Sequence, residues 1–434
     1  MRNFAFKILE KLNYILRSVK IVDPRSKYNG QKNDILIESG IISQISKKIN
    51  YKKHYIEIKI KNLHVSPGFL DINSRIGEPG FEHKEDAKSG SNAAKKGGYT
   101  GIVYMPSTNP PIQNASDINF VKKIFEKNIV DVFPSGCITK NMQGTEITEM
   151  YNMKNAGAVT FTDDLNSIEN PMIMSIALEY AKEFKMPIIV IPFVKKLCEN
   201  GLIHEGKTST LLGLNGIPNI AEEIRISRDI ELAKYNKGRL HFSAISTQKS
   251  FELIKKAKEE KINISADIAA YQLILNDEML SGFDTNIKVF PPIREKKIQK
   301  ELVKNIKNGN IDAISSNHKP VEIEKKKCSF NNADFGMIGL ETTFAIANTV
   351  LKNKVELEKI ISLLSISPRK ILNIKCPKIE ETNKANITLY DPEKKWTFEY
   401  NDIKSKSKNT PFKKYEFTGK TLGIFNKGQI FLDD

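Results

Sequence analysis

Cysteines and long apolar runs are both scarce in this 434-residue chain. The four cysteines lie far apart without a CxxC pair, which excludes a disulfide framework and a thiolate zinc site. No apolar run approaches the roughly 18 residues that a membrane-spanning helix needs. The first twenty residues lack the apolar stretch and the small-residue cleavage site of an export signal. We therefore expect a cytoplasmic chain with reduced thiols and no membrane partner.

Arginine is also scarce, although the chain is basic. The sequence has 67 basic and 51 acidic residues, for a formal net charge of +16, and almost all of the basic residues are lysines scattered along the chain. Such an excess can attract nucleic acid, but sequence-specific binders favour clustered arginines. No Walker-type GxxxxGK[ST], no GxGxxG after a strand and no GxSxG elbow occurs. We expect neither a nucleic-acid partner nor nucleotide or serine-hydrolase chemistry.

Short β-rich runs alternate with helical segments through the middle of the chain. The hydrophobic content of 40% is enough for a large core. From residue 65 onwards, segments of helical periodicity separate eight β-rich runs: VSPGFLDI, TGIVYMP, VDVFPSG, GAVTFTD, PIIVIPF, RLHFSAI, INISADI and IDAISS. Residues 65–372 are therefore predicted to form an α/β fold, a (β/α)8 TIM-type barrel, whose usual size is about 250 residues.

The helical segments carry their own boundary signals. In STQKSFELIKKAKEEK, Phe251, Ile254 and Ala257 fall on one face, and Ser246 or Thr247 is available as the amino-terminal cap. The run GEPGFEHKED is read as the entry to another helix, with acidic residues near its amino end.

Strand-like runs without helices flank the predicted barrel on both sides. YILRSVKIV, DILIE, IISQI and HYIEIKI precede it, and NITLYD, WTFEYN and LGIFNKGQIFL follow it. The simplest arrangement pairs the strands of residues 13–64 with those of residues 373–434 in one small β-sandwich-like domain. Residues 1–12 form an extension that could pack on a partner or on the chain itself, and KSKSKNTPFKK is a polar loop.

Several segments of the barrel resemble dihydroorotase, a cyclic amidohydrolase of pyrimidine synthesis. The resemblance rests on PGFLDINSRIGEPGFEHKED, GGYTGIVYMPSTNPP, TFTDD, GLIHEG, LHFSAIST, FDTNIKVFPPIRE, ISSNHKP and GMIGLET, in consistent order and spacing. It covers nearly the whole chain beyond the first dozen residues. It implies the amidohydrolase kind of barrel, with its site at the carboxyl ends of the strands.

The positions at which the family holds its metals depart from the family pattern. Only Asp164, or its neighbour Asp163, keeps a carboxylate among the ligand-equivalent positions, which are Asn73, Arg75, Asp164, Ile191, Ala244 and Asn317. The resemblance assigns the general-base position to Asn317, with His318 beside it. The substrate contacts of the family correspond to Gly77, Ser107 and Val321.

These exchanges remove the chemistry that the resemblance implies. Imidazole and carboxylate side chains bind zinc-class ions, which lower the pKa of bound water to about 7. Arg75 instead places a permanent positive charge where a cation belongs. We therefore expect no cofactor, or zinc if the chain is active, and predict that Arg75 forms an ion pair with Asp163 or Asp164.

Two hypotheses on function remain open. In the first, the chain is an inactive, metal-free dihydroorotase-like protein that acts as a structural partner of aspartate carbamoyltransferase, a role that the resemblance implies. In the second, it is an active dihydroorotase that converts dihydroorotate to N-carbamoyl-L-aspartate with a non-standard site made of Asp163, Asp164 and His318. Since active members are often dimers or larger assemblies, we also expect a homo-oligomer.

Overall fold

A computed structural model describes residues 13–51 and 54–433. The predicted N-terminal extension, residues 1–12, lies outside the described residues. Within this part of the chain, no helix combines the length and the apolar character needed to span a membrane.

Eight parallel strands form the barrel, and each overlaps one of the eight predicted runs. Their order in the sheet is β15-β14-β13-β10-β9-β8-β7-β6, and an isolated parallel bridge between Ser74 and His318 brings the first and last strands together. The nearly closed (β/α)8 barrel is therefore confirmed. Its strands are β6 (Phe69–Ser74), β7 (Tyr99–Tyr104), β8 (Asp131–Gly136), β9 (Thr160–Phe161), β10 (Pro187–Val190), β13 (Arg239–Phe242), β14 (Ile264–Ala269) and β15 (Ala313–Ser315).

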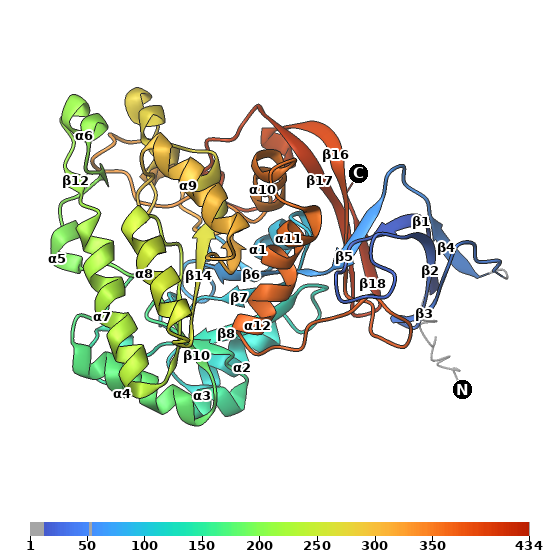
Figure 1. The fold of residues 1–434 in the computed structure, drawn as a ribbon, viewed down its shortest axis with the longest axis horizontal. Helices are drawn as coiled ribbons and strands as arrows, with labels where there is room; N and C mark the ends of the chain where they lie inside the picture. Colours follow the sequence, from blue (N-terminus) through green and yellow to red (C-terminus); the bar gives the residue numbers. More distant parts are fainter. Residues whose placement is uncertain (1–12, 52–53, 434) are drawn as a thin grey trace, which may run out of the picture.

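Helices surround the barrel on its outer side (Figure 1). Helix α8 (Gln248–Glu259) begins after Thr247, whose side chain accepts a hydrogen bond from the Ser250 N–H, and it buries Phe251 as predicted. The run GEPGFEHKED does lead into a helix, since Asp86 caps α1 (Ala87–Lys96). The other helices are α2 (Ala115–Ile124), α3 (Met150–Ala156), α4 (Pro171–Glu183), α5 (Lys195–Cys198), α6 (Lys207–Leu212), α7 (Ile220–Asn236), α9 (Lys296–Lys307), α10 (Thr343–Leu351), α11 (Leu357–Ile361) and α12 (Ser367–Ile371).

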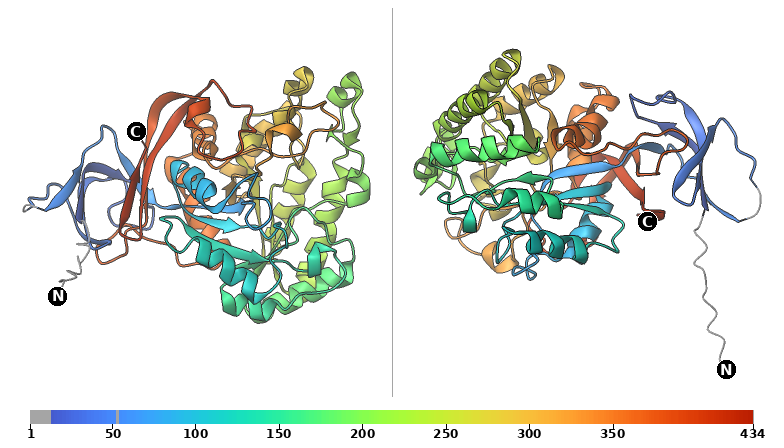
Figure 2. Two further views of the ribbon diagram at one scale, coloured as in Figure 1. Left: turned by 180° about the vertical axis from the view of Figure 1, so that it is seen from behind. Right: turned by 90° about the horizontal axis from the view of Figure 1, so that it is seen from below.

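The two chain ends share a second sheet beside the barrel, which Figure 2 shows from behind and from below. Its order is β18-β17-β16-β5-β1-β2-β3, with β4 paired to β1. The runs NITLYD and WTFEYN, expected as two strands, form one strand with an irregularity between Asp391 and Lys395. The strands are β1 (Asn13–Ile21), β2 (Lys32–Glu38), β3 (Ile41–Ser46), β4 (Tyr55–Ile58), β5 (His64–Pro67), β16 (Ile387–Phe398), β17 (Tyr415–Asn426) and β18 (Gln429–Leu432).

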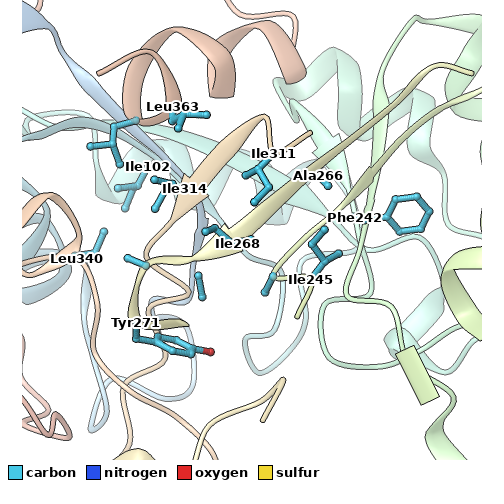
Figure 3. Packing of buried hydrophobic residues seen from close by; sticks show 14 of the residues in the cluster. Ile102, Phe242, Ile245, Ala266, Ile268, Tyr271, Ile311, Ile314, Leu340 and Leu363 are labelled. Atoms are coloured by element: carbon cyan, nitrogen blue, oxygen red, sulfur yellow. The ribbon is translucent and has the colours of Figure 1, made fainter. Parts of the chain in front are cut away.

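A continuous apolar core joins the barrel strands to their helices. Ile102, Phe242 and Ile268 are fully buried in this core (Figure 3). Burying a side chain of this size contributes about 1.5–3 kcal/mol. The strands are therefore held rigidly, and the loops at their carboxyl ends have fixed starting points. One longer excursion between β10 and β13 adds a small two-stranded sheet, β11 (Ile203–His204) with β12 (Gly216–Ile217).

Candidate functional site

Polar side chains converge at the carboxyl ends of the barrel strands, where barrels of this type build their sites. Arg75 follows β6, Ser107 follows β7, Asp164 follows β9 and Asn317 follows β15. Three of these side chains are buried: Arg75, Asp164 and Asn317. Arg75 forms hydrogen bonds to both of the others, so it links them. The fold thus brings residues from distant parts of the sequence to one centre.

An arginine–carboxylate ion pair lies at this centre. Nε of Arg75 is 2.8 Å from Oδ2 of Asp164, and Nη2 of Arg75 is 2.5 Å from Oδ1. The pairing is bidentate, the strongest form of this interaction. The Ser107 hydroxyl donates a further hydrogen bond of 2.5 Å to Asp164 Oδ2. The predicted ion pair is therefore confirmed, with Asp164 as the partner.

Two amides complete the polar network around the guanidinium. Nη1 of Arg75 donates to Oδ1 of Asn317 at 2.9 Å, and Nδ2 of Asn317 donates to the Tyr271 hydroxyl at 2.7 Å. Asn73 donates to the Ser243 hydroxyl at 3.0 Å, while its own Oδ1 has no hydrogen-bond partner among the residues that the structure describes. An amide cannot take up a proton at neutral pH. Asn317 therefore orients its neighbours and cannot act as a general base.

The remaining ligand-equivalent positions carry aliphatic side chains. Ile191 and Ala244 are buried and provide no lone pair. The backbone of Ala244 nevertheless has φ of 55°, and Asp164 and Asn317 have φ of 50° and 44°. Left-handed backbone at non-glycine residues is costly and clusters at functional sites. These three loop entries therefore share a left-handed backbone at the carboxyl ends of their strands.

The positions equivalent to the family's substrate contacts also depart from that role. A Cβ added at Gly77 would lie 2.2 Å from the Phe81 carbonyl oxygen and 2.9 Å from that of Glu85. The loop from Gly77 to Glu85 therefore leaves no room for a side chain at position 77. An arginine could be accommodated there only if the backbone moved. Val321 is buried, and its N–H donates to Oδ1 of Asn409 at 3.1 Å.

The contacts of Asp163 and His318 are made with residues outside the Arg75–Asp164 pair. Asp163 accepts hydrogen bonds from the N–H groups of Ile138 and Thr139 at 2.8 and 3.0 Å, and burial raises its pKa to about 6. Nδ1 of His318 accepts from the Gly339 N–H, and Nε2 lies 3.5 Å from Glu85 Oε2. The structure therefore does not gather Asp163, Asp164 and His318 into one reacting group.

A cavity of about 240 Å³ opens next to the ion pair, and two lysines line it. Neither Lys84 nor Lys319 was singled out from the sequence, although Lys319 stands inside the ISSNHKP segment. Burial, followed by the charge of Arg75, lowers the pKa of Lys319 to about 8. The sequence feature that could have indicated Lys319 is its place directly after His318. Its direction into the cavity depends on contacts made by residues far along the chain.

Comparisons with known proteins support the resemblance seen in the sequence. The family model described as "Dihydro-orotase-like" matches residues 63–250. The chain is 41% identical over 392 residues to a dihydroorotase of Carboxydothermus hydrogenoformans, covering 90% of this chain and 91% of that one. It is 40% identical to a dihydroorotase of Thermoanaerobacter sp., covering 92% of each chain. Among solved structures, the L-hydantoinase of Arthrobacter aurescens matches with a TM-score of 0.84 at 21% identity, covering 97% of this chain and 96% of that chain.

The expectation that no cofactor is required is wrong for the family to which these matches point. Proteins named dihydroorotase and hydantoinase are typically zinc-dependent, so zinc is the cofactor that the likeness implies. The side chains at the six ligand-equivalent positions are two amides, two aliphatic groups, one guanidinium and one carboxylate, which do not fit the imidazole-rich donor set of such a centre. Within residues 13–51 and 54–433, no three His, Cys, Asp or Glu side chains are grouped so as to hold a metal ion. We therefore derive no chemical step through zinc for this chain.

The likeness to curated relatives extends over the barrel and the sheet of the chain ends. Identity of about 40% over nine-tenths of both chains far exceeds what a shared barrel fold alone would give. The exchanged side chains lie within a scaffold that is otherwise that of its relatives. This chain belongs to the dihydroorotase family.

Proposed function

We propose that this dihydroorotase-family chain no longer hydrolyses dihydroorotate and acts in pyrimidine biosynthesis as a structural partner of aspartate carbamoyltransferase. The observation that carries the proposal is the bidentate Arg75–Asp164 ion pair at the centre of the site. It occupies the position where the resemblance expects the reacting groups. The retained scaffold supports a role that needs the shape of the protein and not its chemistry.

Hydrolysis of a cyclic amide needs an activated water molecule and a group that accepts its proton. Asp164 accepts two hydrogen bonds from Arg75 and one from the Ser107 hydroxyl, which take up about three of the four lone-pair positions of its carboxylate. Arg75 remains protonated at any physiological pH. Lys319, with its pKa of about 8, is mostly an ammonium at pH 7 and donates protons instead of accepting them. The side chains at this centre thus favour binding over proton transfer.

The first test is turnover of dihydroorotate by the purified chain supplied with zinc. We expect no formation of N-carbamoyl-L-aspartate above the buffer rate. The matched variant carries five replacements that rebuild the family donor set: Asn73→His, Arg75→His, Ile191→His, Ala244→His and Asn317→Asp. Stoichiometric zinc with turnover in the unmodified chain would end the proposal, whereas both gained only in the rebuilt variant would support it.

The second test addresses the partner. Aspartate carbamoyltransferase of the same host is mixed with the chain at micromolar concentration, and the mass of the eluting species is measured by light scattering. We expect a stable complex whose mass is the sum of the two components, and the chain alone reports whether it also self-associates. Two separate peaks under gentle conditions would contradict the partner role.

An active dihydroorotase is the second candidate, and the likeness to relatives named dihydroorotase favours it. It requires a proton acceptor other than Asn317. Asp163 and His318 would have to leave the contacts with Thr139 and Gly339 that they make in this structure. The turnover assay separates the two candidates directly.

A further inference from the structure

Two buried lysines connect two loops at the carboxyl ends of the barrel strands. The β14 loop, residues 283–290, belongs to the connection that follows strand β14, and the β15 loop, residues 322–336, belongs to the connection that follows β15. Lys288 in the first loop is 2% exposed, and Lys326 in the second is 6% exposed. Lysine is rarely buried to this extent without partners, so the protein itself must satisfy both amino groups.

Lys326 reaches from the β15 loop into the β14 loop. Its Nζ donates to the Asp334 carbonyl oxygen, in its own loop, at 2.7 Å. It also donates to the carbonyl oxygens of Thr285 at 2.8 Å and Lys288 at 3.3 Å, both in the β14 loop. An ammonium group has three protons to donate, and three carbonyl oxygens accept them. The Thr285 hydroxyl donates in return to the Lys326 carbonyl oxygen at 2.6 Å, so this lysine is fastened at both ends.

Lys288 makes the reverse connection, from the β14 loop into the β15 loop. Its Nζ donates to the carbonyl oxygens of Phe330 at 2.8 Å and Asn331 at 3.1 Å. The same group lies 5.4 Å and 4.9 Å from the ring centres of Phe330 and Phe335, within cation–π range. The Gly336 N–H donates to the Lys288 carbonyl oxygen at 2.9 Å. Each loop therefore inserts a lysine into the backbone of the other, and we call this arrangement the two-lysine clasp.

The clasped loops also hold a residue of the central network. Nδ2 of Asn317 donates to the carbonyl oxygen of Phe290, the last residue of the β14 loop, at 3.2 Å. The Lys319 N–H donates at 2.8 Å to the carbonyl oxygen of Met337, which directly follows the β15 loop. Asn317 in turn accepts from Nη1 of Arg75 at 2.9 Å. The position of Asn317 against Arg75 therefore depends on both loops being in place.

We propose that the two loops open and close as one unit, and that the hydrogen bonds of Lys326 keep this unit closed. Two of the three hydrogen bonds from its Nζ cross between the loops, so their loss releases both loops together. Local opening of this kind is a separate event from global unfolding and is reported by hydrogen exchange. The proposal holds whether or not the chain turns over dihydroorotate, so the two can fail separately.

The test is hydrogen exchange of the full chain, followed by mass spectrometry of its peptides. We expect Lys326→Met to speed exchange about tenfold in both loops, including the amides of Lys288 and Gly336, because it removes hydrogen bonds from a charged donor. The Lys319 amide should follow them, whereas helix α7 should be unchanged. Lys327→Met is the matched control, because Lys327 is the next residue in the same lysine run and is exposed; it should leave exchange within twofold.

Chemical rescue separates the role of the amino group from a general loss of packing. Lys326→Ala lacks the atoms from Cγ to Nζ, which correspond to n-propylammonium, so this ion should restore slow exchange in both loops and propanol should not. Thr285→Val, a smaller change that removes the hydroxyl bond to the Lys326 backbone, should speed exchange in both loops less than Lys326→Met does. Faster exchange in the β15 loop alone, equal effects of Lys326→Met and Lys327→Met, faster exchange in α7 as well, or equal rescue by propanol would each overturn the proposal.

Discussion

Replacing Arg75 by methionine tests the structural role of the central ion pair. The Asp164 side chain is 1% exposed, and Arg75 provides two of its three side-chain hydrogen-bond donors. Removing one partner of a buried ion pair leaves an uncompensated charge and costs about 3–5 kcal/mol. For 434 residues, an unfolding entropy of about 2.1 cal/mol/K per residue gives about 0.9 kcal/mol/K. We therefore expect Arg75→Met to lower Tm by roughly 3–6 °C, measured by calorimetry.

The matched control removes both charges together. Arg75→Met combined with Asp164→Leu replaces the pair by apolar groups, and such exchanges are often close to neutral. We expect the double variant to recover most of the lost stability, which gives a large coupling energy in the double-mutant cycle. A loss below about 1 kcal/mol in Arg75→Met, or equal losses in the single and double variants, would refute the reasoning.

Three further predictions concern other parts of the fold. Gly77→Ala should lower the free energy of unfolding, measured with denaturant, by about 1–3 kcal/mol, because the added Cβ would lie 2.2 Å from the Phe81 carbonyl oxygen. Gly282→Ala is the control and should be close to neutral, because no atom lies within 4 Å of the added Cβ. Similar losses of stability in both variants would contradict the packing argument. Burial raises the pKa of Glu341 to about 7, so its contribution to stability is complete below about pH 4.5 and is lost as the pH rises through 7. Glu341→Gln should therefore remove about 3 kcal/mol of pH dependence over that range, and an unchanged pH profile of the unfolding free energy would contradict this. Thr247→Ala should cost about 1 kcal/mol through loss of the helix cap, whereas no change in urea midpoint would show that the cap is dispensable.

The barrel was predictable because its strands are buried on both faces. A run such as PIIVIPF is continuously apolar, and the segments between the runs keep the helical period, so each element is readable locally. The Arg75–Asp164 contact was predictable for a related reason. Both residues follow barrel strands, and the carboxyl ends of those strands face one another across the barrel mouth.

The cavity was not predictable from the same signals. Lys319 belongs to a loop whose position is set by Met337 and Asn409, which lie far along the chain. Asn409 comes from the run KSKSKNTPFKK, which reads as an ordinary polar loop. In the structure, this run packs against the barrel loops and also bonds Glu85 through Ser405. Such long-range contacts leave no periodic signature in the sequence.

The same limit applies to Gly77. Its identity shows that a family side chain is absent, but the sequence does not show that the backbone has closed over the vacant place. That closure follows from the approach of the Phe81 and Glu85 carbonyl groups.

The most direct test of the account is the rate at which the purified, zinc-supplied chain forms N-carbamoyl-L-aspartate from dihydroorotate. The account predicts a rate equal to that of buffer, because Arg75 and Asp164 occupy the centre as an ion pair. Turnover that depends on added zinc, and that disappears when Asp164 is replaced by asparagine, would contradict it.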